Sequence, residues 1–124
     1  MNLLLDTHAL LWWLEDNPAL SNEARAAISN EPDIFVSAAS VWEIAIKEST
    51  GKLRAPRRFL DHVEREGFQP LPISLTHAYA AGSLPRHHND PFDRMLVAQA
   101  TLEGLTVVTR DSRFARYGVA TLPA

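Results

Sequence analysis

The chain has 124 residues, of which 46% are hydrophobic and 22% are charged. This length and apolar content suffice to bury a sizeable core, so we expect a single domain over residues 1–124. The hydrophobic content excludes an intrinsically disordered chain, and the absence of cysteine excludes a disulfide-stabilised fold. The 12 basic and 15 acidic residues give a net charge of −3, which taken alone argues against a nucleic-acid partner.

The apolar runs near the N-terminus are too short to span a membrane. Leu3–Leu5 and Ala9–Leu14 are separated by Asp6, Thr7 and His8. Neither run approaches the roughly 20 residues that a spanning helix needs, and the segment lacks the pattern of a secretory signal peptide. We therefore expect no membrane partner and a cytoplasmic location.

Short apolar runs alternate along the chain with segments of helical periodicity. Strands are expected at residues 2–5, 34–36, 69–73, 105–109 and 119–122, the third at an edge because it contains two prolines. Helices are expected over 8–15, 21–28, from Ser37 or Ser40 to about 50, 57–66, 74–83 and 91–103, with a helical turn over 111–117. This alternation predicts an α/β sandwich with a parallel sheet covered by helices on both faces.

Acidic residues recur where the expected strands end or the neighbouring helices begin. Asp6 directly follows the first strand, and Asp111 lies just beyond the strand at 105–109. Glu43 lies about two turns into the helix after the second strand, and Asp93 lies in the first turn of a later helix. In an open parallel sheet, ligands bind beyond the C-terminal ends of the strands, so these acids are expected at one edge.

Each acid also has an ordinary structural interpretation. Asp6 and Asp111 can cap the helical segments after them, Asp90 can cap the helix that begins with a proline, and Glu43 can pair with Lys47. As a group the acids fit this interpretation less well, because two carboxylates 4 Å apart repel by about 4 kcal/mol at an effective dielectric of about 20. Oxygen ligands suit hard cations, so clustered acids predict Mg²⁺ or Mn²⁺ rather than zinc.

Four segments resemble the signature blocks of PIN-domain ribonucleases, above all those of VapC-type toxins from bacterial type II toxin–antitoxin pairs. They are LLDTHALLWWL, SAASVWEIAIK, HHNDPFDRMLVAQA and LTVVTRDSRF, in the family's order, and the match runs from residue 3 to residue 117. The resemblance implies a PIN-like three-layer α/β/α sandwich with a mainly parallel sheet. It also implies metal-dependent cleavage of RNA that leaves a 5′-phosphate, a homodimer, and a cognate VapB-type antitoxin.

Carried over residue by residue, the resemblance makes Asp6, Glu43, Asp93 and Asp111 the catalytic, metal-binding acids. Asp93 is preferred to Asp90 because the apolar helix that follows it matches the family's block; Asp90 keeps its capping role, and a secondary role in the site stays open. Asp111 is at the position that the family requires least strictly. The acids are expected to hold one or two Mg²⁺ or Mn²⁺ ions, which activate water and stabilise the attacking and leaving oxygens.

Four neighbours of these acids are candidate substrate or supporting residues. Thr7 and Thr109 are expected to bond a carboxylate or a metal-bound water. Arg94 and Arg110 are expected to contact phosphate, because each is adjacent in sequence to a proposed metal ligand.

Two further features stay open. His87 and His88 could act as a general acid or a metal ligand, or have neither role. The segment 47–58 carries five basic residues against Glu48 alone, which fits either phosphate contact or a solvated face with ordinary ion pairs.

Two other functions compete with the nuclease. A phosphoacceptor receiver domain needs an acidic pair at the first strand and a lysine on the last, whereas Asp6 stands alone and Lys47 and Lys52 are the only lysines. A catalytically silent PIN-fold RNA-binding or regulatory module is the main alternative, against which the intact acids argue. Without the four proposed ligands, 12 basic residues face 11 acidic ones, so the acidic total is no argument against an RNA substrate.

Overall fold

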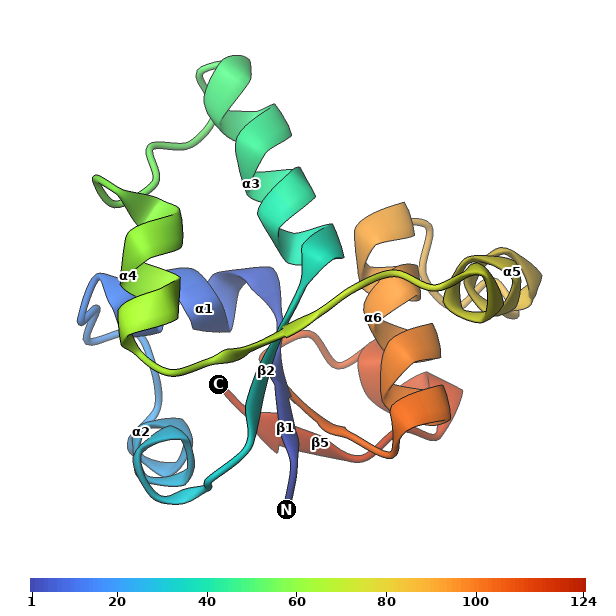
Figure 1. Ribbon diagram of the computed structural model, residues 1–124. Coiled ribbons are helices and arrows are strands. Elements are labelled where there is room, and N and C mark those ends of the chain that lie inside the picture. Colours follow the sequence, from blue (N-terminus) through green and yellow to red (C-terminus); the bar gives the residue numbers. More distant parts are fainter.

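A five-stranded parallel sheet lies between two layers of helices in the computed structural model, which describes all 124 residues (Figure 1). The strands are β1 (Leu3–Leu5), β2 (Ile34–Ser37), β3 (Gln69–Leu71), β4 (Thr106–Thr109) and β5 (Thr121–Pro123). Every strand pair is parallel, in the order β3-β2-β1-β4-β5. The three-layer α/β sandwich predicted from the sequence is confirmed.

The helical layers hold α1 (Thr7–Leu14), α2 (Asn22–Asn30), α3 (Ala38–Ser49), α4 (Phe59–Arg65), α5 (Leu75–Ser83), α6 (Pro91–Glu103) and the 3-10 turn η1 (Phe114–Tyr117). In Figure 1, α1, α2 and α4 lie on one side of the sheet, and α6 lies on the other with α5 beyond it. Helix α3 rises from β2 and contacts both α1 and α6. No helix combines the length and the apolar content that crossing a bilayer requires.

The central strand β1 contributes side chains to two separate cores, because successive side chains of a strand point to opposite faces. Leu3 and Leu5 pack in the core under α1 and α2, and Leu4 packs on the other face with Val97 and Phe114. All three leucines of β1 are fully buried, as continuous apolar strands between two helical layers require.

Local signals set most of the element boundaries. Strand β3 pairs only with β2, which confirms the edge position that its prolines predict. Of the two serines proposed to begin α3, Ser37 is the N-cap: its side chain accepts from the backbone N–H of Ala39 at 3.0 Å. The helical turn expected over 111–117 is shorter, spanning only Phe114–Tyr117.

The strand register brings the C-terminal ends of β2, β1 and β4 to one edge of the sheet. Leu5 is paired with Val36 on one side and Val108 on the other, and the backbone N–H of Asp6 donates to Val108 at 3.1 Å. Helices α1 and α3 leave from this edge. It is therefore the place where side chains from distant parts of the chain can meet.

Candidate active site

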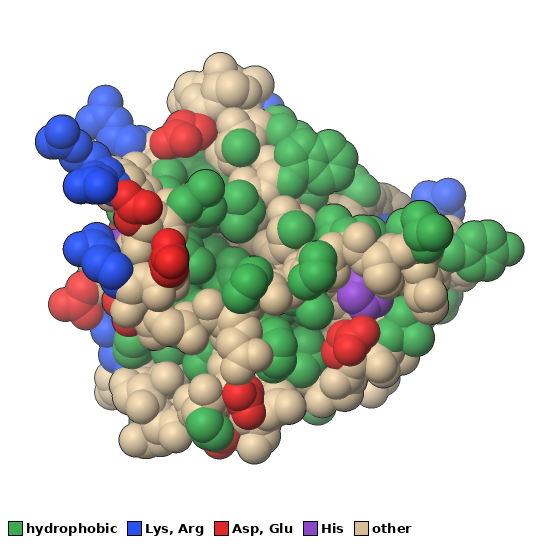
Figure 2. All heavy atoms as spheres, in the orientation of Figure 1, with side chains coloured by type: hydrophobic (Ala, Val, Ile, Leu, Met, Phe, Trp, Pro, Cys, Tyr) green, Lys and Arg blue, Asp and Glu red, His purple; other side chains and the backbone are tan.

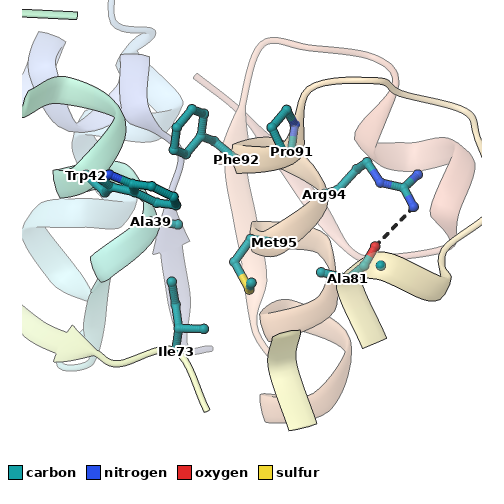
Figure 3. Close-up of a pocket in the computed structure, with 9 residues that line it drawn as sticks. Ala39, Trp42, Ile73, Ala81, Pro91, Phe92, Arg94 and Met95 are labelled. Atoms are coloured by element: carbon teal, nitrogen blue, oxygen red, sulfur yellow. Dashed lines mark hydrogen bonds between the residues drawn. The ribbon is translucent and has the colours of Figure 1, made fainter. Parts of the chain in front are cut away.

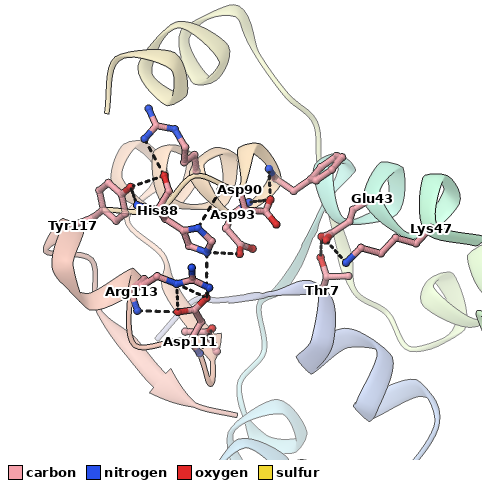
Figure 4. A network of polar contacts seen from close by, with 12 residues as sticks. Thr7, Glu43, Lys47, His88, Asp90, Asp93, Asp111, Arg113 and Tyr117 are labelled. Carbon is pink, nitrogen blue, oxygen red and sulfur yellow. Dashed lines mark hydrogen bonds and ion pairs between the residues drawn. The ribbon is translucent and has the colours of Figure 1, made fainter. Parts of the chain in front are cut away.

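The four predicted acids lie at or near this edge, each on a different segment. Asp6 is the N-cap of α1. Glu43 lies on α3, Asp93 lies in the first turn of α6, and Asp111 follows β4 (Figure 4). The negative charges of Asp6, Glu43 and Asp111 all raise the pKa of Asp93. The sequence-distant acids thus form one electrostatic unit.

Asp6 is buried and serves first as a helix cap. One of its oxygens accepts from the backbone N–H of Ala9 at 2.8 Å, so the structural interpretation of this residue is confirmed. Burial raises the pKa of Asp6, and the negative charge of Asp111 adds to the effect. Hydrogen bonds from the Thr109 side chain and from Ala9 oppose the rise without cancelling it. A carboxylate in this condition is one that a bound cation would stabilise.

Glu43 is 5% exposed, and both of its oxygens have partners. The Thr7 hydroxyl donates to Oε1 at 2.6 Å, and the Lys47 ammonium lies 2.9 Å from Oε2. Thr7 therefore bonds a carboxylate as expected. The pair with Lys47 forms too, but on a buried carboxylate rather than on an exposed helix face, and the hydrogen bond to Glu43 raises the pKa of Lys47.

Asp93 and Asp111 face each other across His88 (Figure 4). The Nε2 atom of His88 lies 2.9 Å from Asp93 and 3.1 Å from Asp111. Burial, followed by the negative charge of Asp90, raises the pKa of Asp93 to about 8. Asp111 behaves in the opposite way, because its hydrogen bonds with Arg113 lower its pKa to about 2. Asp93 and Asp111 are thus neighbours with very different proton affinities.

Asp90 caps α6, as predicted from its position before Pro91. Its side chain accepts from the backbone N–H groups of Phe92 at 2.8 Å and Asp93 at 3.2 Å. This cap fixes the first turn of α6, which carries Asp93. Asp90 therefore acts on the site in two ways: it fixes the position of Asp93, and its negative charge raises the pKa of Asp93.

Of the two histidines left open by the sequence, His88 belongs to the site and His87 does not contact the acids. His88 is 6% exposed, whereas His87 is exposed and packs edge-on against Tyr117. One sequence signal could have singled out His88: it lies two residues before the cap of the helix that carries Asp93.

Arg94 does not reach toward a substrate, and the phosphate contact expected for it is wrong. The side chain is 8% exposed, and its two terminal nitrogens donate to backbone oxygens at 2.9 to 3.4 Å. Figure 3 shows the bond to Ala81. The acceptors are Ala81, Leu84, Pro85 and His88. Arg94 thus holds the segment from the end of α5 to His88 against α6.

Arg110 is also turned away from the acids, which corrects the second expected phosphate contact. Its guanidinium donates to the backbone oxygens of Ala19 and Ala124. It also lies over the ring of Trp12, 4.4 Å from the ring centre. Although Arg110 directly precedes Asp111, these bonds direct its side chain toward α1.

The donor set fits a hard divalent cation. Single donor atoms of His88, Asp93 and Asp111 lie within 4.8 Å of one another, and the negative charges of Asp6 and Glu43 reach Asp93. Burial first, and then the negative charge of neighbouring acids, raises the pKa values of Asp6 and Asp93, and a bound cation would offset both effects. Carboxylate oxygens are the ligands that Mg²⁺ and Mn²⁺ prefer.

Comparisons with known proteins agree with this geometry. A family model described as the PIN domain matches residues 3–120. Ribonuclease VapC22 of Mycobacterium tuberculosis is 30% identical over 118 residues, covering 90% of this chain and 88% of that protein. DNA-bound VapBC of Salmonella typhimurium has a TM-score of 0.73 at 22% identity, covering 98% of this chain and 97% of that one. VapBC2 of Rickettsia felis, bound to a promoter DNA fragment, has a TM-score of 0.68 at 16% identity and covers 98% of each chain.

The raised pKa of Asp93 predicts a pH-dependent loss of stability in the metal-free protein. The folded pKa of about 8 exceeds the ordinary 3.8, so this carboxyl favours folding at low pH and its contribution is lost as the pH rises from about 4 to about 8. Asp93→Asn removes the titrating group. The free energy of unfolding in EDTA, measured with urea, should therefore increasingly favour the variant across this range.

The control for this comparison is Asp16→Asn, which removes a carboxyl that is 91% exposed. It should follow the pH curve of the parent. If the free energies of unfolding of the parent and of Asp93→Asn changed with pH in parallel, the raised pKa of Asp93 would be contradicted.

Proposed function

Since this chain belongs to the PIN-domain family, we propose that it is a divalent-metal-dependent endoribonuclease, the toxin of a type II toxin–antitoxin module. The observation that carries the proposal is the gathering of four carboxylates from four segments at one edge of the sheet, where their charges act on Asp93. The 30% identity to a ribonuclease supports RNA as the substrate. Cellular RNA is translated in the cytoplasm, so we place the activity there and assign it to a single PIN domain over residues 1–124.

In this proposal the Mg²⁺ or Mn²⁺ on which cleavage depends is bound by four acids, Asp6, Glu43, Asp93 and Asp111. When bound, the ion would activate a water molecule and compensate the negative charge that develops on the phosphodiester. Cleavage would leave a 5′-phosphate. The chain itself must hold the carboxyl groups in the right orientation. Thr7 fixes one oxygen of Glu43 at 2.6 Å, as a hydrogen-bonded partner of a metal ligand does.

Replacing one of the acids by its amide tests the activity. Asp6→Asn and Asp93→Asn should each lower the rate of Mg²⁺-dependent RNA cleavage by more than the roughly 10–100-fold that loss of a supporting residue costs. The same variants should lose the rise in melting temperature that Mg²⁺ gives the parent. Asp16→Asn, on an exposed turn, is the matched control and should cleave like the parent.

The same experiment separates the nuclease from its alternative. A catalytically silent RNA-binding module would bind RNA without cutting it, and its cellular toxicity would be the same with or without Asp6. If both amide variants cleaved RNA at the parental rate, the proposed metal ligands would be wrong.

The segment between α3 and α4 is the surface that we propose for the RNA backbone. Lys52, Arg54 and Arg57 are exposed and make no ion pair, unlike Lys47, which is bound to Glu43, and Arg58, which is bound to Asp61. Figure 2 shows Lys and Arg side chains gathered at the side of the molecule where α4 lies. These free cations follow directly on the helix that carries Glu43, so they suit phosphates on either side of the cleaved bond.

The charge of this segment can be tested without altering the acids. Arg54→Gln with Arg57→Gln should weaken the binding of a non-cleaved single-stranded RNA. The slope of log affinity against log salt should fall by about 0.7 for each phosphate that the variant no longer neutralises. The double substitution to lysine keeps the charge and should retain most of the slope. An unchanged slope in the glutamine variant would place the RNA elsewhere.

An apolar groove between α3 and α4 is the surface that we propose for a VapB-type antitoxin. Its walls include Val41, Trp42 and Ala45 of α3 and Leu60 and Val63 of α4, and it encloses about 850 Å³. Trp42 is 61% and Leu60 62% exposed, which is unusual for large apolar side chains that have no partner. The VapBC complexes among the similar structures support an antitoxin segment as the occupant.

Introducing a charge into the groove tests this partner. Leu60→Glu should weaken the binding of the proposed VapB-type antitoxin by more than about 10-fold, because it places a carboxylate against apolar side chains. Leu102→Glu, on α6 and 47% exposed, is the matched control and should bind like the parent. Calorimetry of the purified pair gives the affinities, and equal values for both variants would exclude the groove.

A second copy of this chain is the other partner that we propose, as a homodimer. Leu75 and Tyr79 of α5 are 91% and 82% exposed. They lie on the helix beyond α6, away from the groove lined by α4 (Figure 1). A dimer through α5 would therefore leave the antitoxin groove accessible.

A further inference from the structure

Both ring nitrogens of His88 have partners, and these partners fix where its proton lies. The backbone N–H of Asp90 points to Nδ1, 3.1 Å away. A backbone N–H can only donate, so Nδ1 must accept and cannot carry a hydrogen. The ring is therefore the neutral tautomer that bears its hydrogen on Nε2.

The Nε2–H group of His88 lies between two carboxylates of the candidate active site. Its distances are 2.9 Å to Oδ2 of Asp93 and 3.1 Å to Oδ2 of Asp111. One carboxylate comes from the first turn of α6 and the other from the segment after β4. The ring donates to Asp111 and contacts Asp93, and thus links two segments that no backbone hydrogen bond joins at this point.

The His88 ring is held in this orientation by its surroundings. Its backbone N–H donates to the Tyr117 hydroxyl at 2.9 Å, and the ring packs edge-on against Phe114 with centres 6.4 Å apart. Its backbone oxygen accepts from Arg94 at 3.4 Å, as one of four carbonyls that this arginine binds. Arg94 directly follows Asp93, so the loop that presents His88 is tied to the helix that presents a carboxylate.

We propose that His88 is a positioning residue, whose neutral ring donates Nε2–H to Asp111 and lies 2.9 Å from Asp93, and so holds both carboxyl groups in place for a divalent cation. The inference rests on the proposed metal-dependent function. The carboxylates are oriented by His88 before any cation binds, which reduces the rearrangement that binding requires. Loss of such a partner of metal ligands typically lowers metal affinity about 10–100-fold.

Direct coordination by His88 is the competing interpretation, and the geometry disfavours it. A coordinating Nε2 would have to lose its hydrogen, and the neutral ring would then carry it on Nδ1. That hydrogen would point at the backbone N–H of Asp90, 3.1 Å away. Coordination through Nε2 therefore requires the loop and the cap of α6 to rearrange.

The state of the ring can be read directly in a long-range proton–nitrogen correlation spectrum of the histidine side chains. The His88 signals, assigned by their loss in His88→Gln, should show a protonated Nε2 and an unprotonated Nδ1, with and without Mg²⁺. A hydrogen on Nδ1, or loss of the Nε2 hydrogen when Mg²⁺ is added, would overturn the proposal.

Calorimetric Mg²⁺ titration tests the effect on the metal site. His88→Ala should bind Mg²⁺ about 10–100-fold more weakly than the parent. His88→Gln should recover most of the loss, because its amide N–H can donate from nearly the position of Nε2. His87→Ala is the matched control and should bind as the parent does. A glutamine variant that is folded by circular dichroism but no better than alanine would overturn the proposal, as would parental affinity in His88→Ala.

These outcomes are distinct from failure of the proposed function. A parent protein that neither binds Mg²⁺ nor cleaves RNA would remove the metal site itself, and the inference with it. A parent that does both, with an alanine variant that binds Mg²⁺ equally well, would remove only the role of His88.

Discussion

Repulsion among buried carboxylates is the physical constraint on which the rest of this structure depends. The edge of the sheet fixes Asp6 and brings the other acids near it, and each acid needs a partner that limits the cost. The partners differ in kind: a helix N-terminus for Asp6, Lys47 for Glu43, the His88 ring for Asp93, and that ring with Arg113 for Asp111. The pKa values of Asp93 and Asp111, about 8 and about 2, diverge because burial and neighbouring acids act on Asp93, whereas hydrogen bonds with Arg113 act on Asp111.

The fold and the acids could be predicted from the sequence because both follow from local signals. Apolar strands predict a parallel sheet, and an acid placed just after such a strand must lie at its C-terminal edge. Asp6 shows that the structural and the functional interpretation need not compete, since it caps α1 and also belongs to the group of acids. The burial of the Glu43–Lys47 pair, in contrast, depends on packing between layers that spacing along one helix does not reveal.

The roles of Arg94 and Arg110 could not be predicted, because adjacency in sequence does not set the direction of a side chain. Successive residues of a helix are about 100° apart around its axis, so Arg94 points away from the side that Asp93 faces. Arg110 is turned by contacts with Trp12 and the backbone near the C-terminus, which come together only in the folded chain. His88 depends on the same kind of long-range contact.

Trp42 contributes both to the apolar groove and to the contact between α3 and α6. It lines the apolar groove and directly precedes Glu43. It also packs edge-on against Phe92 (Figure 3), with ring centres 5.3 Å apart, and Phe92 directly precedes Asp93. A mutation that reshapes the groove here for a new protein partner also alters the contact between α3 and α6, and with it the spacing of two acids. The shape of the groove and the spacing of Glu43 and Asp93 therefore cannot change independently at this position.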